Sequence, residues 1–229
     1  MGYGGMGRNS SRFRQKVIDM KIDTLTFNIF QENTYIVYDE TGQALLIDPG
    51  FNTEEERKVL DDHVEKNNIK IARCVITHPH PDHFLGGKYI IDKYGVTPEI
   101  YYTAGRLFHI FEVYMAPMGF MHYQSFVPQY NITEDSVISF GNSSMTVLYT
   151  PGHADGSVCF YCEKEKALFS GDVLFRNGIG RTDMPTGDFD TLINSIRDKI
   201  FVLPDDVKVY SGHGDVTEVG YEKRSNPYF

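Results

Sequence analysis

The sequence predicts a protein of the α/β class, in which helices cover the faces of β-sheets. Short apolar runs typical of strands alternate with segments typical of amphipathic helices in both halves of the chain. The 229 residues are 41% hydrophobic and 23% charged, which suffices for a sizeable buried core. Histidine and aspartate motifs follow the predicted strands, where α/β proteins commonly place their sites.

Four strands are predicted in the N-terminal half. The first two alternate apolar and polar residues, which is typical of strands with one buried face. The third ends at the turn Pro49-Gly50, and we expect the first three strands to pair in antiparallel order. The fourth is an apolar run that indicates a buried strand. The predicted strands span residues 22–27, 33–38, 44–48 and 71–76.

Helices are predicted on both sides of the fourth strand. Asn52 and Thr53 precede acidic residues and then spaced apolar residues, which is typical of a capped amphipathic helix. A second helix is expected to begin at Asp82 and His83. The C-terminal half is predicted to hold strands at 144–149, 157–161, 167–169 and 207–210 and a helix at 189–201.

Composition and charge limit the cellular context and the partners. Residues 17–229 are expected to form a single domain after a mobile N-terminal tail over residues 1–16, which has no apolar run typical of a signal peptide or membrane anchor. The net charge of −9, without a basic block, argues against nucleic-acid and membrane partners and leaves a small-molecule substrate. Three sparse cysteines favour a reducing compartment, so we expect a cytoplasmic location. The sequence does not indicate the oligomeric state.

The first motif with chemical potential is His78-Pro-His80-Pro-Asp82-His83. Side chains alternate in extended backbone, so His78 and His80 project the same way and can bind one metal ion. Asp82 and His83 are expected to point toward a second ion. Protonated imidazoles packed this closely would repel one another and offer no packing advantage. A metal site is therefore the preferred interpretation.

Three further ligand-type side chains follow predicted strands: His153, Asp172 and His213. Taken singly, such residues are more often turn caps or core hydrogen-bonding groups, so their interpretation depends on the first motif. The two oxygens of Asp172 could bridge two cations. Five histidines and two aspartates then suffice for two divalent ions, with open positions for water and substrate. Zinc suits these ligands best, and iron or manganese is also compatible.

The remaining histidines and the cysteine pair are interpreted as structural. His63, His109 and His122 lie in predicted helices or loops without ligand-type partners, so we expect them to be structural or solvated. Cys159 and Cys162 match a CxxC string. Residues three apart in a strand face opposite sides, however, so they should not chelate or react together.

The motifs THPHPDH, TPGHADGS, SGDVLF and SGHGD occur in the order and approximate spacing of the metallo-β-lactamase superfamily. The resemblance covers nearly the whole chain after the tail. It implies a four-layer αβ/βα sandwich, in which two mixed β-sheets pack face to face and helices flank them. The site would lie along one edge of the sheets.

The resemblance also implies a role for each ligand-type residue. Asp48, in the segment LLIDPG, matches an acidic residue of this family that we assign to orienting a ligand histidine. The implied ligands are His78, His80 and His153 for the first metal and Asp82, His83 and His213 for the second, with Asp172 bridging both.

Within the superfamily, the segment GIGRTD after Asp172 and the C-terminal segment from Gly212 resemble the short bacterial members of the glyoxalase II branch, which hydrolyse thioesters of glutathione. Arg181 stands where that branch places a basic residue that contacts the glycine carboxylate of glutathione; a structural salt bridge is the alternative. The sequence departs from full-length glyoxalase II at Asp215, where those enzymes carry an aromatic residue. Their C-terminal helical domain is expected to be absent here.

The resulting hypothesis is a metal-dependent hydrolase that resembles hydroxyacylglutathione hydrolases. A hydroxide bridging the two metals would attack a carbonyl carbon, and Asp82 is the expected catalytic residue because it would hold that hydroxide in line. The alternative is a persulfide dioxygenase of the same superfamily, an oxidoreductase with one iron on His78, His153 and Asp172. Residues 108–130 are rich in aromatics and methionines. They form either a wall or lid that selects an apolar acyl group, a subunit interface, or ordinary packing.

Overall fold

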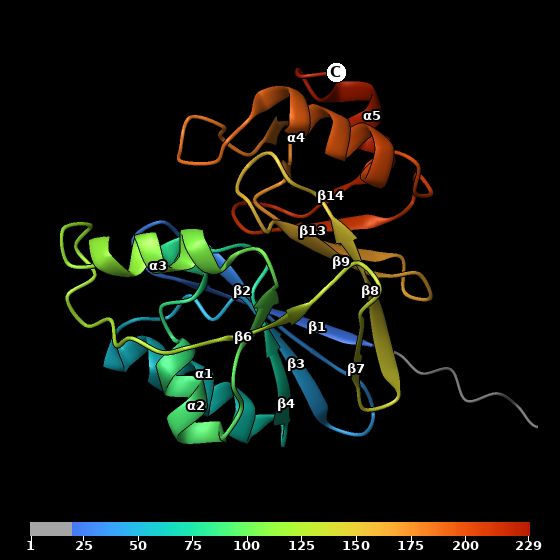
Figure 1. Ribbon diagram of the computed structural model, residues 1–229. Coiled ribbons are helices and arrows are strands. Elements are labelled where there is room, and N and C mark those ends of the chain that lie inside the picture. The colour runs from blue at the N-terminus through green and yellow to red at the C-terminus, as the bar shows by residue number, and fades with distance from the viewer. Residues whose placement is uncertain (1–19) are drawn as a thin grey trace, which may run out of the picture.

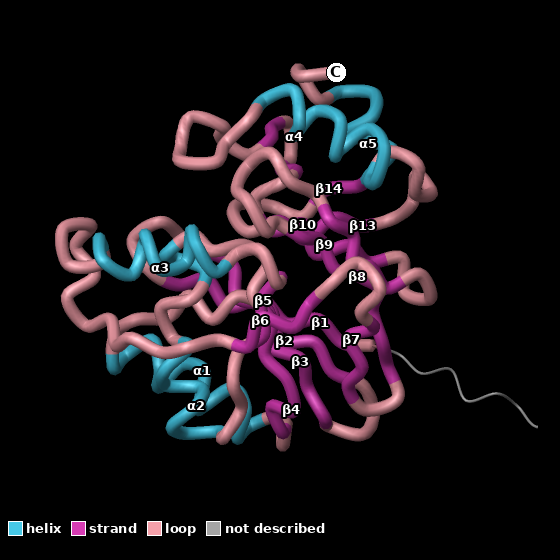
Figure 2. The backbone as a smooth tube through the Cα atoms, in the orientation of Figure 1, coloured by secondary structure: helices cyan, strands magenta, loops and turns pink. Residues whose placement is uncertain are grey.

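The computed structural model describes residues 20–229, so the predicted tail over 1–16 lies outside the described residues. Two six-stranded sheets pack face to face, and helices lie on their outer sides (Figure 1). The backbone tube shows strands in the centre, with α1, α2 and α3 beside the first sheet and α4 and α5 beyond the second (Figure 2). This arrangement confirms the four-layer αβ/βα sandwich with two mixed sheets.

The first sheet has the strand order β1-β2-β3-β4-β5-β6. Its first three strands pair in antiparallel order as predicted, whereas β3 to β6 are parallel. The two short strands β5 and β6 were not predicted. The strands are β1 (Lys21–Phe27), β2 (Glu32–Tyr38), β3 (Gln43–Ile47), β4 (Lys70–Val75), β5 (Glu99–Tyr101) and β6 (Gln129–Ile132).

The second sheet has the order β14-β13-β10-β9-β8-β7, in which only β10 and β13 pair in parallel. A separate two-stranded hairpin, β11–β12, follows β10. The strands are β7 (Val137–Phe140), β8 (Ser143–Tyr149), β9 (Val158–Cys162), β10 (Ala167–Gly171), β11 (Leu174–Phe175), β12 (Gly178–Ile179), β13 (Lys208–Ser211) and β14 (Thr217–Glu218).

Helix α1 begins where the sequence predicts, because Thr53 and Glu56 form a capping box that satisfies backbone N–H groups of the first turn. No helix among the described residues is long and apolar enough to span a membrane. The helices are α1 (Glu54–Lys66), α2 (Gly87–Tyr94), α3 (Gly105–Tyr114), α4 (Phe189–Ser195), which continues as the π-helical turn η2 (Ile196–Ile200), and α5 (Val219–Ser225).

The prediction of a helix that begins at Asp82 and His83 is wrong. These residues belong to a single 3₁₀ turn, η1 (Pro81–His83). Phe84 then leaves helical geometry with φ −137°, and α2 begins only at Gly87. A Cβ atom on Gly87 would lie 2.1 Å from the ring of Phe126, so glycine permits this close entry into the helix. Asp82 and His83 are thus held by a turn, outside any long helix.

The core follows the alternation of side chains along the strands. On β2, Tyr35 and Val37 pack between the two sheets, while Ile36 packs with α1 on the outer face. Cys159 lies in the cluster beneath α4, whereas Cys162 lies between the sheets, so the prediction that the two cysteines face opposite sides is confirmed. Packing on both faces fixes the strands that carry the loops of the site.

Candidate metal centre

The ligand-type side chains all follow strands that end at one end of the sandwich. In the first sheet β3 and β4 are parallel, so Asp48 and His78 emerge side by side. In the second sheet β8, β10 and β13 share one direction and deliver His153, Asp172 and His213. The two ends are joined where the backbone N–H of Asn33 donates to the carbonyl of Gly212, at 2.8 Å. Residues from both halves of the sequence therefore meet.

His78, His80 and His153 form the first group. Nε2 of His78 lies 3.0 Å from Nδ1 of His80, and Nε2 of His153 lies 2.8 Å from Nδ1 of His80 and 3.3 Å from Nε2 of His78. Tetrahedral zinc with Zn–N bonds of about 2.0–2.1 Å brings its ligand nitrogens to roughly this spacing. The extended backbone at the first motif thus places the two imidazoles beside each other and beside a third.

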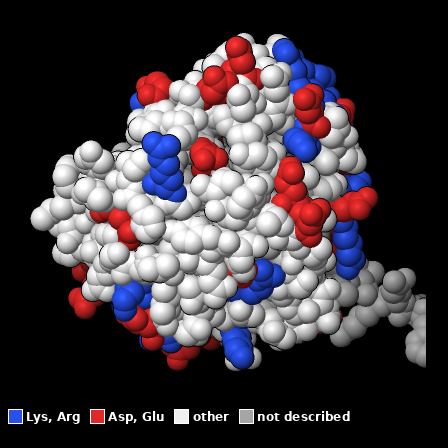
Figure 3. Space-filling view, viewed as in Figure 1, with Lys and Arg blue, Asp and Glu red and all other residues white. Residues whose placement is uncertain are grey.

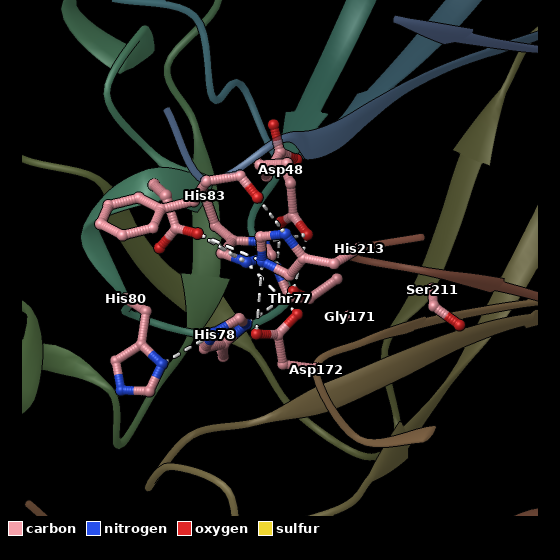
Figure 4. Close-up of polar contacts among 12 residues, drawn as sticks. Asp48, Thr77, His78, His80, His83, Gly171, Asp172, Ser211 and His213 are labelled. Atoms are coloured by element: carbon pink, nitrogen blue, oxygen red, sulfur yellow. Dashed lines mark hydrogen bonds and ion pairs between the residues drawn. The ribbon is translucent and has the colours of Figure 1, made fainter. Parts of the chain in front are cut away.

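Asp82, His83 and His213 form the second group. Nε2 of His213 lies 3.2 Å from Oδ2 of Asp82, and Nε2 of His83 lies 3.7 Å from the same oxygen. Asp172 lies between the two groups, with Oδ1 3.4 Å from Nε2 of His83 and Oδ2 3.7 Å from Nε2 of His153. In Figure 4 the side chains of His83, His213 and Asp172 converge on one point, with His78 and His80 to one side.

The Asp48 carboxylate fixes the orientation of His83. Its Oδ2 lies 2.9 Å from Nδ1 of His83, and the backbone N–H and hydroxyl of Thr77 donate to its two oxygens at 2.6 and 2.7 Å. A carboxylate held this way keeps the proton of His83 on Nδ1 and turns the Nε2 lone pair toward Asp172. Sequence reasoning did not single out Thr77, which also contacts Nδ1 of His78 at 3.0 Å.

Backbone carbonyls orient two further imidazoles. Nδ1 of His153 donates to the carbonyl of Arg181 at 2.7 Å, and Nδ1 of His213 donates to the carbonyl of Phe30 at 3.0 Å. Both contacts leave Nε2 free to face the centre of the site. The role of Phe30 was not predicted, because a backbone carbonyl at the tip of the β1–β2 hairpin has no side-chain signature.

The ionisation of these groups suits a divalent cation. Burial lowers the pKa of His78 well below its usual range and that of His80 to about 3, so both imidazoles keep a free lone pair. Burial alone would raise the pKa of Asp172, but His83 and His213 outweigh it and hold the carboxyl ionised. Burial opposes the charge on His83, yet the carboxylates of Asp172, Asp82 and Asp48 raise its pKa well above the ordinary value. A proton on His83 therefore occupies the place that a metal ion would take.

Buried polar atoms without a partner also indicate that the site suits a divalent cation. Nε2 of His83 and Oδ1 of Asp172 are buried and have no hydrogen-bond partner among the described residues. Buried polar atoms of this kind are costly unless a ligand or ion satisfies them. Several groups of side chains here could hold a metal ion, and the two described above contain six of the seven predicted ligands, with Asp172 adjoining both. His63, His109 and His122 belong to none of the groups found among the described residues.

Glu32 is a buried carboxyl group that sequence reasoning missed. It is fully buried at the start of β2 and belongs with Asp48 and His83 to a further group of possible ligands. Burial raises its pKa well above the ordinary value, and one of its oxygens has no hydrogen-bond partner among the described residues. The hydroxyl of Thr34 donates to its other oxygen at 2.9 Å. Glu32 lies on the same face of β2 as Thr34 and Ile36, and a charged residue in phase with the apolar Ile36 was the available signal.

A cavity of about 270 Å³ opens onto the metal ligands. Asp82, Asp172 and His213 keep exposed surface there, with 15%, 13% and 26% of their side chains accessible. Arg181 reaches the edge of the cavity, but its guanidinium is paired with Asp183 at 2.6 and 2.8 Å. Both interpretations of Arg181 thus have a structural basis: it is in an ion pair and it faces the cavity.

Several known proteins are similar to this chain in sequence. A family model described as the metallo-beta-lactamase superfamily matches residues 28–213. Hydroxyacylglutathione hydrolase GloC of Haemophilus influenzae is 34% identical over 213 residues, which cover 91% of this chain and 98% of that protein.

Solved structures are also similar over most of this chain. TTHA1623 in a di-iron-bound form has 29% identity and a TM-score of 0.80, covering 90% of this chain and 100% of that one. The BLEG-1 B3 metallo-beta-lactamase has 28% identity and a TM-score of 0.79, covering 91% and 99%. ETHE1 from Myxococcus xanthus has 26% identity and a TM-score of 0.73, covering 90% and 83%.

Proposed function

The chain belongs to the metallo-β-lactamase superfamily, and from this premise we propose that it is a metal-dependent hydrolase of small thioesters. One observation carries the proposal: side chains from separate loops converge in neighbouring groups that could each hold a metal ion, and the Asp172 carboxylate lies within 3.7 Å of an imidazole of each. The similarity to a hydroxyacylglutathione hydrolase over nearly the full length of both chains supports the thioester class.

The side chains divide into two sets of candidate ligands, with one carboxylate common to both sets. His78, His80 and His153 would hold one ion, Asp82, His83 and His213 the other, and Asp172 both. When bound, the ions would lower the pKa of a coordinated water to about 7 and polarise the carbonyl oxygen of the substrate. Zinc fits the nitrogen-rich set, and iron is a second option, since TTHA1623 is described with two irons.

The protein itself orients the reacting water. Asp82 keeps an exposed edge at the floor of the cavity, where its carboxylate would accept a hydrogen bond from that water and aim it at the carbonyl carbon. Addition of water and loss of the C–S bond give a carboxylic acid and a thiol. Arg181, at the rim, would meet a carboxylate of the thiol portion if it exchanged Asp183 for the substrate.

A metal-reconstitution assay tests the proposal. The metal-free protein is loaded with zinc, iron or manganese, its metal content is measured by mass spectrometry, and thioester, lactone and β-lactam hydrolysis are compared. We expect about two ions per chain and the highest rate on thioesters. His80→Ala should lose metal and hydrolysis together, whereas His109→Ala, which changes an exposed imidazole outside the ligand groups, should retain both. Unchanged hydrolysis in metal-poor His80→Ala protein would contradict the proposal.

A second candidate function is that of a mononuclear iron persulfide dioxygenase. His78, His153 and Asp172 could supply the two-histidine, one-carboxylate set, because Nε2 of His153 lies 3.3 Å from Nε2 of His78 and 3.7 Å from Oδ2 of Asp172. The similarity to ETHE1 supports this alternative. One iron per chain together with oxygen uptake on glutathione persulfide would favour it. Two ions and no oxygen uptake would favour hydrolysis.

A further inference from the structure

We propose that the cavity over the metal ligands selects substrates whose acyl group is apolar, an aliphatic or arylalkyl chain. The inference rests on the proposed thioester hydrolysis and names the part of the substrate that the chain recognises. Its residues are Phe30, Phe111, Met118 and Met184, which line the cavity together with the ligand side chains.

These four side chains come from three separate segments that meet over the site. Phe111, in α3, is buried and its ring lies 5.0 Å from the imidazole of His80, so it forms the inner wall. Met118 and Met184 are partly buried against the same apolar cluster. Thioether side chains adapt to irregular apolar shapes, which suits a wall that must accept a chain. Because the cavity also contains Asp82 and Asp172, an apolar group held here would be attached directly to the reacting carbonyl.

The apolar character continues outward from the cavity. Phe30 is 48% exposed at the tip of the β1–β2 hairpin, and its ring lies 5.9 Å from that of Phe120 in the segment after α3. Residues 113–130 contain no lysine, arginine, aspartate or glutamate. The space-filling view accordingly shows few charged side chains over α3, whereas they gather over α1 and α2 (Figure 3). The exposed Phe30 thus extends the apolar surface beyond the cavity, as is common beside ligand-binding grooves.

Beyond the metal ligands, the cavity wall offers few charged or polar groups that could bind a highly polar acyl group. Apart from the metal ligands, Arg181 is the one charged side chain among the lining residues, and its Nε and Nη2 atoms already donate to the carboxylate of Asp183. A hydroxyl-bearing acyl chain that lies against Phe111 and Met118 would lose its hydration there, because neither side chain offers a strong hydrogen-bonding group. An alkyl chain would lose nothing comparable and would gain from burial.

A chain-length series measures this preference. S-acyl-N-acetylcysteamine thioesters from acetyl to octanoyl share one thiol, so their kcat/KM values report the acyl group alone. Each added methylene should raise kcat/KM roughly three- to fourfold until the chain outgrows the cavity, as expected for burial of one CH₂. A lactoyl thioester should be hydrolysed more slowly than the 2-methylpropanoyl thioester, in which a methyl group replaces the hydroxyl. A flat series, or a preference for lactoyl, would overturn the inference.

Polar substitutions of equal length locate the selecting residues. The double variant Met118→Gln with Met184→Gln should reduce the gain to less than about twofold per methylene, measured relative to its own rate on the acetyl thioester. Met121→Gln is the matched control, because Met121 is 73% exposed and outside the cavity lining. It should keep the wild-type slope. An unchanged slope in the double variant would exclude the assigned residues.

Binding of product-like acids separates this inference from the proposed function. Calorimetry on the metal-loaded protein should show hexanoate binding at least tenfold more tightly than acetate, and the double variant should abolish the difference. If no thioester is hydrolysed but hexanoate is still preferred, the pocket stands and the proposed reaction fails. If thioesters are hydrolysed and the two acids bind equally, the reaction stands and the apolar pocket does not.

Discussion

Two carboxylates at opposite ends of the sandwich, Asp39 and Asp172, show what distinguishes a structural polar group from one that awaits a ligand. Asp39 follows β2 at the end remote from the site and is almost fully buried. The backbone N–H and hydroxyl of Thr41 donate to its Oδ1, and the N–H of Asn142 and hydroxyl of Ser143 donate to its Oδ2. Each oxygen has two donors, and the contacts tie the β2–β3 turn to the β7–β8 turn.

Asp172 has the opposite surroundings. Its neighbours are the imidazoles of His83, His153 and His213, at 3.4 to 3.7 Å, and its Oδ1 has no hydrogen-bond partner among the described residues. Both carboxyls have lowered pKa values, but donors stabilise the anion of Asp39 whereas nearby imidazoles stabilise that of Asp172. A satisfied network holds two sheets together; an unsatisfied one leaves coordination positions open.

The largest expected effect follows from removing the shared charge. Asp172→Asn keeps the shape of the side chain but replaces one ligand oxygen by an amide nitrogen with no lone pair to offer. We expect loss of at least one ion per chain and an activity lower by at least about 100-fold, since even outer partners of metal ligands are worth 10–100-fold. Metal analysis and kcat/KM for thioester hydrolysis measure this.

Asp39→Asn is the matched control for this change at the other end of the sandwich. It should keep its metal content and its activity per folded molecule. Equal metal loss in both variants would mean that the two carboxylates do not differ in the way described.

A smaller loss of metal affinity is expected when Asp48, which contacts the candidate ligand His83, is replaced. Asp48→Asn preserves the positive φ of 53° at this position, because asparagine tolerates left-handed backbone. If the amide oxygen keeps the hydrogen bond from the Thr77 N–H, its NH₂ group faces Nδ1 of His83 and drives the His83 proton to Nε2. Metal affinity should fall about 10–100-fold with the fold intact. Competition with a chelator measures the affinity, and circular dichroism checks the fold.

The outcome at Asp48 distinguishes orientation from simple charge. Asp48→Glu retains the negative charge but is too long for the short contacts to Thr77. We expect it to bind metal as poorly as Asp48→Asn. Near wild-type affinity in Asp48→Glu would show that charge near His83, and not its tautomer, is what matters.

Asp39→Asn itself tests the structural half of the comparison. Its amide nitrogen would face two donors in place of one carboxylate oxygen, so two hydrogen bonds are lost and their donors remain buried. We expect a free energy of unfolding lower by about 2 kcal/mol. Urea denaturation of the metal-free protein measures it. A free energy of unfolding within about 0.5 kcal/mol of wild type, the size of a neutral surface change, would remove Asp39 as a link between the sheets.

The fold class and the clustering of the candidate ligands could be predicted for a common reason: both depend on local pattern. Period-two alternation marks β1 and β2, and Thr53 with Glu56 marks the start of α1. The spacing of His78 and His80 places two imidazoles side by side. In each case the physical cause lies within a few residues of the feature.

Features that depend on tertiary contacts could not be predicted in the same way. The strand β5 has only three residues and pairs in parallel with strands far apart in sequence, so no local pattern marks it. The carbonyl of Phe30 becomes a partner of His213 only because the hairpin reaches across to the other sheet. Glu32 is buried for the same reason, at the junction of the two sheets.

The smallest effect concerns acid stability. Burial alone would raise the pKa of Asp39, but the donors from Thr41, Ser143 and Asn142 outweigh it and lower that pKa below the ordinary value near 3.8. A carboxyl whose pKa is lower in the folded state stabilises the fold fully above its unfolded pKa. That contribution disappears as the pH falls through the folded pKa. The difference in unfolding free energy between wild type and Asp39→Asn should therefore be constant above about pH 5 and shrink below about pH 4. Because both proteins carry the same site residues, protonation of those residues cancels in the difference. Urea denaturation of metal-free samples from pH 7 to 3 measures it, and a difference that grows on acidification would assign the link to some group other than the Asp39 carboxylate.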